Sequence, residues 1–106
     1  MEKFHLEKMI NGWFIGDFSP AAYSTRFFEV ALKKYKAGDF ELDHYHRVAT
    51  EITLIVSGSV EMLGSEWGEG DIILLNPGEA TSFRAITDTV SVVVKFPSIQ
   101  NDKYTI

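Results

Sequence analysis

The chain has 106 residues, of which 45% are hydrophobic and 24% are charged, so it suits one compact domain and is too hydrophobic to be disordered. Its formal net charge of −5 argues against a nucleic-acid partner, because an acidic surface repels the phosphate backbone. The absence of cysteine excludes disulfides, thiolate catalysis and cysteine-ligated zinc sites.

The first 25 residues carry the only helical signals in the chain. Phe4, Met9 and Ile10 could form one apolar helix face, and Ser19 followed by Pro20 is typical of a helix start. This segment lacks the apolar core of a signal peptide, and no apolar run along the chain is long enough to cross a membrane. We therefore expect a cytoplasmic protein without a membrane partner.

Residues 26–97 read as the core of a single domain that spans residues 1–106. Glycine and other turn residues interrupt short apolar runs about every eight to twelve positions, which is typical of an all-β sandwich or barrel of about seven to nine strands. The runs are 27–38, 51–57, 59–63, 71–75, 81–86 and 89–96, with a short strand through Trp67. The polar tail, residues 98–106, is predicted to be loose or to pack on a partner subunit.

The stretch HYHRVATE, residues 44–51, holds the strongest candidate site. Residues two apart on a strand point to the same face, so His44 and His46 project together. If the strand that begins at Glu51 pairs with the histidine strand, its carboxylate can reach the same point. Two imidazoles and one carboxylate suit a divalent transition metal such as Fe, Mn, Ni or Zn.

The glycines that flank this stretch extend the pattern. Gly38, five residues, His44-x-His46, four residues, Glu51, six residues and Gly58 resemble the first motif of the cupin superfamily at every defined position. The resemblance implies a double-stranded β-helix, or jelly-roll, barrel. It also implies that His44, His46 and Glu51 are metal ligands.

A second cupin motif is only partly present, in GDIILLNPGEATSFRA. Gly70 and Gly78 fall in place, while Pro77 is one position late. Thr81 stands where metal-binding cupins have a fourth ligand, a histidine, and Ala85 stands where asparagine is usual. Thr81 could hold a metal-bound water, or it could be an ordinary strand residue. The resemblance therefore implies a three-ligand metal site of lower affinity.

Alternation along the strands suggests which other side chains surround a ligand. If Glu51 points inward, Thr53 and Ile55 do so as well, and if Thr81 points inward, so does Phe83. Tyr35 and Phe40 flank the first motif and are candidates for the cavity mouth, although core packing is the simpler role for each. Both faces of the strand 51–57 are apolar, which suggests a homodimer.

These observations leave three functions open for a small-molecule ligand. The first is a metal-dependent enzyme, since similar cupins include dioxygenases, isomerases and decarboxylases. The second is a metal-free module that binds or senses a sugar or organic acid, which the missing fourth histidine favours. The third is metal-free acid/base catalysis with His46 as the base and Glu51 beside it, for which the sequence shows no clear tyrosine partner.

Overall fold

The computed structural model describes residues 1–106 and contains eleven strands with one turn of 3₁₀ helix, η1 (Leu6–Lys8). The strands are β1 (Trp13–Gly16), β2 (Tyr23–Ser24), β3 (Glu29–Tyr35), β4 (Phe40–His46), β5 (Thr50–Ser57), β6 (Ser59–Met62), β7 (Ser65–Gly68), β8 (Ile72–Leu75), β9 (Thr81–Ala85), β10 (Thr89–Phe96) and β11 (Lys103–Thr105). The all-β prediction is confirmed, and the strands beyond the expected number are the short terminal ones, β1, β2 and β11. No helix is long and apolar enough to cross a membrane.

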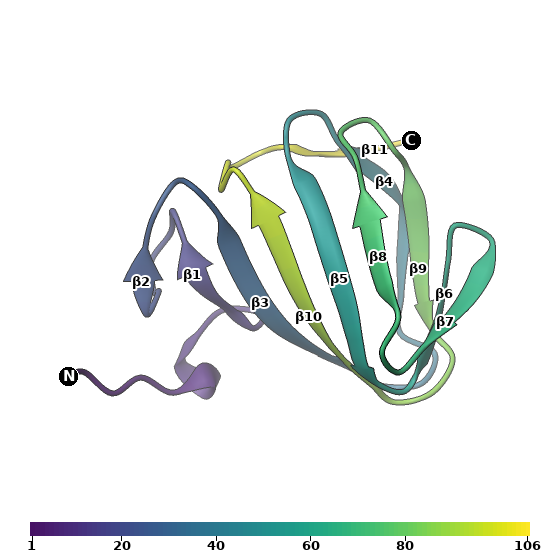
Figure 1. Ribbon diagram of the computed structural model, residues 1–106, viewed down its shortest axis with the longest axis horizontal. Coiled ribbons are helices and arrows are strands. Elements are labelled where there is room, and N and C mark those ends of the chain that lie inside the picture. Colours follow the sequence, from purple (N-terminus) through teal and green to yellow (C-terminus); the bar gives the residue numbers. More distant parts are fainter.

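The strands form two facing sheets (Figure 1). One sheet has the order β2-β1-β3-β10-β5-β8, and the other has the order β11-β4-β9-β6-β7. Chain neighbours such as β4 and β5 lie in different sheets, so the chain crosses repeatedly from one layer to the other. This arrangement is a double-stranded β-helix, as the sequence predicts.

β-branched residues explain why β5 and β10 are the longest strands. Thr, Val and Ile fill most of both segments, and such side chains fit the pleated surface of a sheet. β10 lies between β3 and β5 and pairs with both along nearly its whole length. These two strands therefore form a continuous wall from one end of the barrel to the other.

The glycines that the motif defines do close turns. Gly38 has a φ of +93° and Gly58 a φ of +89°, a region that other residues rarely enter. A Cβ on Gly58 would lie 2.2 Å from the carbonyl oxygen of Asp88. Gly58 is therefore required both by its backbone conformation and by the close approach of the neighbouring turn.

One end of the barrel is tightly packed. The core cluster consists of Ile55, Val60, Met62, Ile73, Leu75, Phe83 and Ala85. Strands β5 and β8 of one sheet and β6 and β9 of the other contribute to this cluster, which joins the two layers at the end of the barrel where β6, β8 and β9 lie (Figure 1). We call this region the packed end.

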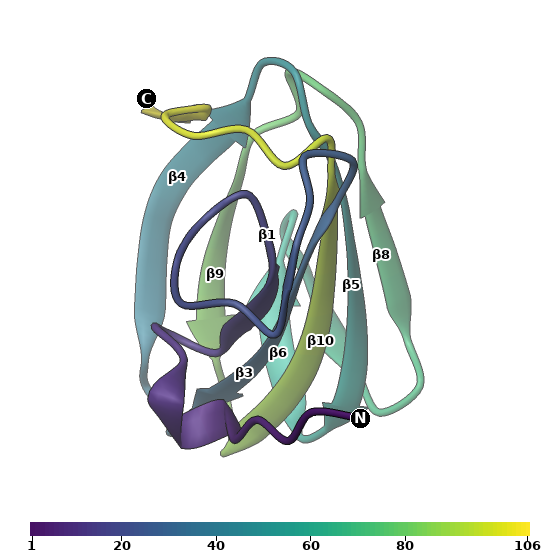
Figure 2. The same cartoon turned by 90° about the vertical axis from the view of Figure 1, so that its left-hand side faces the viewer.

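The N-terminal segment differs from its prediction. Only Leu6–Lys8 is helical, and no residue of that turn is buried, so the helix has no apolar face to hold it. The helix expected after Ser19 does not form; the chain instead makes β2, which pairs with β1 in parallel. Figure 2 shows this segment lying in front of the space between the two sheets, where it adds to the barrel wall.

The C-terminal tail is neither loose nor free of the barrel. Strand β11 pairs with β4, so that Lys103 lies opposite His46. The buried Asp102 carboxylate accepts hydrogen bonds from the backbone N–H groups of Arg47, Val48 and Ala49 at 2.9–3.2 Å. The loop after β4 has no strand partner for these donors, and the tail satisfies them.

Candidate functional site

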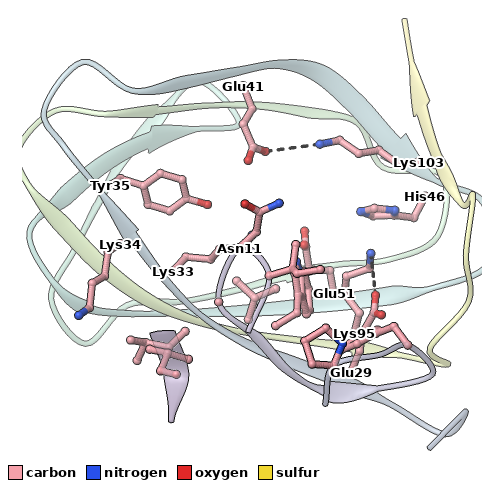
Figure 3. Close-up of a pocket in the computed structure, with 18 of the residues that line it drawn as sticks. Asn11, Glu29, Lys33, Lys34, Tyr35, Glu41, His46, Glu51, Lys95 and Lys103 are labelled. Carbon is pink, nitrogen blue, oxygen red and sulfur yellow. Dashed lines mark ion pairs between the residues drawn. The ribbon is translucent and has the colours of Figure 1, made fainter. Parts of the chain in front are cut away.

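A cavity of about 900 Å³ occupies the end of the barrel opposite the packed end. Its walls come from β3, β4, β5 and β10, from the C-terminal strand and from the N-terminal segment (Figure 3). Ionisable side chains that line it are Glu7, Glu29, Lys33, Lys34, Tyr35, Glu41, His44, His46, Glu51, Lys95 and Lys103. We call this region the polar end.

His44 and His46 lie together in this wall, as their spacing predicts. They are 7% and 6% exposed, and their ring centroids are 5.7 Å apart. The Nδ1 atom of His44 lies 3.0 Å from the carbonyl oxygen of Leu42, and Nδ1 of His46 lies 3.0 Å from that of Asp102. A carbonyl only accepts, so Nδ1 carries the proton in each ring. The lone pair of each neutral ring is therefore on Nε2.

The neutral form of His46 is favoured by its surroundings. Burial lowers the pKa of this imidazole, and the positive charge of Lys95 lowers it further. The hydrogen bond to the Asp102 carbonyl and the charge of Glu51 act in the opposite direction and are outweighed. At neutral pH, His46 therefore offers Nε2 as an acceptor or a ligand.

Glu51 lines the same cavity, but it does not reach the histidines through strand pairing. The condition that its strand pairs with the histidine strand is not met, because β5 pairs with β8 and β10, and β4 pairs with β9 and β11. Glu51 thus faces the histidines from the opposite sheet, directly across from Lys95 on β10. No three histidine, aspartate or glutamate side chains lie close enough together to form a metal-binding group.

Thr81 lies directly opposite His44 on β9, where a fourth ligand is expected in the family motif. Its hydroxyl donates to the carbonyl of Ser82 at 2.6 Å and accepts from the N–H of Leu63 at 3.2 Å. These bonds engage the hydroxyl with the backbone, so the structure favours the ordinary role over the water-holding role. Thr53, Thr81 and Phe83 line a small adjoining pocket of about 40 Å³.

The second glycine motif supports the histidine strand from outside the cavity. Gly78 has a φ of +88°, and its N–H donates to the carbonyl of His46 at 2.6 Å. The turn between β8 and β9 thus holds the end of β4. This contact gives the partly preserved motif a structural role that does not depend on a fourth ligand.

Of the two aromatic residues predicted at the cavity mouth, one lies in the cavity wall and the other does not. Tyr35 lines the cavity, and Figure 3 shows its hydroxyl pointing into it. Burial raises the pKa of this phenol, so it stays protonated and can donate. Phe40 was placed wrongly: it is 68% exposed and pairs with Arg84 on the outer face.

A β-bulge explains the position of Phe40. Glu41 lies opposite Phe83 and His44 lies opposite Thr81, so three steps on β4 match two steps on β9. The extra residue changes which residues face inward. Glu41 joins the histidines inside, and Phe40 turns outward.

Charged groups that the sequence patterns do not predict face the histidines across the cavity. Lys95 and Glu29 form a nearly buried ion pair at 2.9 Å, and Lys103 lies 3.9 Å from Glu41 (Figure 3). Lys33 enters the cavity from β3. Its spacing of two residues from Tyr35, which places both side chains on one face of β3, was the available signal.

Comparison with known proteins assigns the fold. No family model matches the chain, and no curated protein does, whereas many solved structures do. A protein with a double-stranded β-helix domain from Klebsiella pneumoniae is 21% identical with a TM-score of 0.65, over 70% of this chain and 66% of that one. KdgF from Halomonas sp. is 20% identical with a TM-score of 0.65, over 73% and 74%.

Oxalate decarboxylase from Bacillus subtilis, whose Mn(II) centres have been studied, gives 18% identity and a TM-score of 0.66. That match covers 77% of this chain and only 25% of the decarboxylase, so the chain corresponds to a fraction of the larger enzyme. Together these likenesses define the class: the chain has the double-stranded β-helix fold of the cupins.

Proposed function

We propose that this chain is a small-molecule-binding cupin that takes a polar ligand into its barrel cavity, with His44, His46 and Glu51 at the polar centre. One observation carries the proposal. A cavity of about 900 Å³, large enough for a small metabolite, has ionisable side chains at 11 of its 21 lining residues, whereas the packed end is filled by apolar residues alone.

The energetic cost of this lining supports a function for it. Burying imidazole and carboxylate groups away from water is unfavourable unless they find partners. Leucine or valine at the same positions would fill the barrel at lower cost, as Ile55 and Leu75 do at the other end. A sugar or organic acid would supply partners for the groups that the protein leaves open.

A divalent transition metal is the second candidate occupant, and a specific observation favours it. Metal-binding histidines usually present one nitrogen to the ion while the other donates to a carbonyl or carboxylate. His44 and His46 both have this arrangement. These two rings would hold Fe, Mn, Ni or Zn, and Glu51 would have to move toward them from the facing sheet to become a third ligand. A bound ion would supply Lewis-acid polarisation of a ligand oxygen.

Thermal unfolding with and without added metal tests the second candidate. Mn²⁺, Ni²⁺ or Zn²⁺ should raise the Tm of the wild type by binding the native state. His44→Ala and His46→Ala should lose this rise. His5→Ala is the matched control, because the exposed third histidine lies outside the cavity and its loss should leave the rise unchanged.

A Tm rise with a sugar or organic acid that persists in chelator would support the metal-free form of the proposal. That result points to a binding or sensing module, whereas ligand binding that requires metal points to an enzyme of the metal-dependent kind. The proposal fails if neither metals nor polar ligands change the Tm of the wild type.

The outer face of the sheet suggests self-association as part of this function. Val56, Ile72 and Leu74 are exposed on β5 and β8. An exposed apolar sheet face of this kind usually marks a contact with another protein chain. We expect a homodimer through this face. Light scattering after size exclusion should give twice the 12.0 kDa chain mass, and Leu74→Lys should return the monomer.

A further inference from the structure

Four lysines line the cavity, of which Lys34 is exposed and points away from its centre (Figure 3). The other three come from different strands, face inward and differ in their partners. Lys95 pairs with Glu29 at 2.9 Å and Lys103 lies 3.9 Å from Glu41. Lys33 has no carboxylate within ion-pair distance; its ammonium lies 5.0 Å from the centre of the Trp13 ring. Lys33 is therefore the inward-facing lysine that lacks an anionic partner.

The Lys95 pair shows how this chain neutralises a structural lysine. Both its side chains are nearly buried, and Ser98 also donates to Glu29. Nothing comparable is built around Lys33, although burial lowers the pKa of its amine and so indicates a real cost of keeping it charged. Lys95 and Lys103 repel it, while Glu41 and Glu51 attract it from beyond contact distance.

Two neutral polar groups lie on the same side of the cavity. Tyr35 follows Lys33 by two residues on β3, so both side chains point inward. Asn11 comes from the turn before β1, and Figure 3 shows its amide and the Tyr35 hydroxyl pointing into the cavity. A cation, a phenol donor and an amide together suit an oxygen-rich anion.

We propose that Lys33, Tyr35 and Asn11 form a carboxylate subsite, with the Trp13 ring as its apolar wall, so that the ligand is a small polar acid. The inference rests on the proposed function, because it assumes that the cavity takes a small molecule. The carboxylate lies at Lys33, and the uncharged part of the ligand reaches toward His44 and His46 in the facing sheet.

Pairs of probes that differ in one charge test the subsite. Backbone amide signals of the protein are followed by NMR during titration with gluconate and sorbitol, and with succinate and succinamide, in the presence of chelator. The acids should shift the signals of Lys33 and Tyr35 saturably, and the neutral partners should bind at least about tenfold more weakly. Gluconate and succinate separate a sugar acid from a short aliphatic acid.

Variants assign the effect to one amine. Lys33→Gln should weaken acid binding about tenfold or more, whereas Lys33→Arg should retain most of it. Lys36→Gln is the matched control, since Lys36 is exposed just beyond β3 and does not line the cavity. If Lys33→Gln does not fold, the comparison of acid and neutral probes on the wild-type protein still tests whether the cavity holds a carboxylate subsite.

Two results would overturn the subsite: equal binding of acid and neutral probes, or no acid-dependent shift at Lys33 and Tyr35. Neither result contradicts the proposed function, because that function is tested by different measurements. That proposal fails only if metals and neutral ligands also leave the cavity signals and the Tm unchanged.

Discussion

The packed end and the polar end of the barrel share strand β5 but otherwise use different strands, and they differ in what they enclose. Along the inner face of β5, Glu51 is followed by Thr53 and then Ile55. Along β10, Lys95 and Val93 line the cavity, whereas Ser91 and Thr89 beyond them are buried polar residues. β5 thus contributes to the cavity at Glu51 and to the packed end at Ile55.

The difference separates stability from function within one small domain. The packed end gains free energy by removing apolar surface from water. The polar end loses part of that gain because charged groups occupy its walls. Substitutions at the two ends should therefore differ in their effect on the free energy of unfolding and on its pH dependence. The following four changes test this, from the largest expected effect to the smallest.

Ile55→Ala should have the largest effect, because Ile55 is 0% exposed in the core cluster. We expect a loss of about 4 kcal/mol in the free energy of unfolding, measured by chemical denaturation. Leu42→Ala, at a site that is 71% exposed, is the control and should cost less than about 0.5 kcal/mol. Similar losses at the two sites would contradict the assignment of the packed end.

Asp102→Ala should cost about 3 kcal/mol, because three buried or partly buried N–H groups lose a charged acceptor. Burial raises the pKa of this carboxyl, but the hydrogen bonds from Ala49, Val48 and Arg47 lower it by more. A folded-state pKa below the unfolded value near 3.9 means that the carboxylate stabilises the fold above that pH.

This stabilisation should disappear as the pH falls through the lowered pKa of Asp102. Denaturation curves of wild type and Asp102→Ala should therefore differ by a constant amount near neutral pH and converge in strong acid. A difference that does not change with pH would show that the carboxylate charge is not the source of the effect.

Lys95→Met should cost about 2 kcal/mol, below the range for a fully buried pair because the cavity admits some solvent. The loss arises because Glu29 keeps its charge without its cation. Replacing both residues with methionine should recover most of the stability, which a double-mutant cycle measures. Additive losses would instead show that the two side chains do not act as a pair.

Lys33→Met should change stability least, with a gain within about 1 kcal/mol, because it removes a partly buried charge that lacks an anion. Burial lowers the pKa of Lys33 in the folded state, so its charged form opposes folding at neutral pH. This penalty vanishes as the pH rises through the lowered pKa toward the unfolded value. The advantage of the variant should therefore shrink at alkaline pH, as measured by denaturation.

The fold could be predicted because its signals are local. The turn at Gly58 needs a positive φ, and strands β5 and β10 are rich in β-branched residues. The terminal strands β1, β2 and β11 have no such signal. They are two to four residues long and form only because an existing sheet edge offers hydrogen-bond partners, which no short stretch of sequence records.

The candidate site was predictable only in part. The spacing of His44 and His46 defines a shared face regardless of context. Lys33 and Lys95 were missed because alternation shows which residues share a face but not whether that face is inside. A lysine inside a cavity and a lysine in water have the same pattern in the sequence, and the difference arises from the opposite sheet.

The bulge in β4 lets this strand contain one residue more than the facing stretch of β9. Without Asp43, Glu41 would lie two positions before His44, so plain alternation would still point both side chains inward. The end of the strand would stay held by β9 and β11. The chain can therefore gain or lose one residue here without changing which side chains line the cavity, and replacing its carboxylate wall by an aromatic one requires a substitution at Glu41.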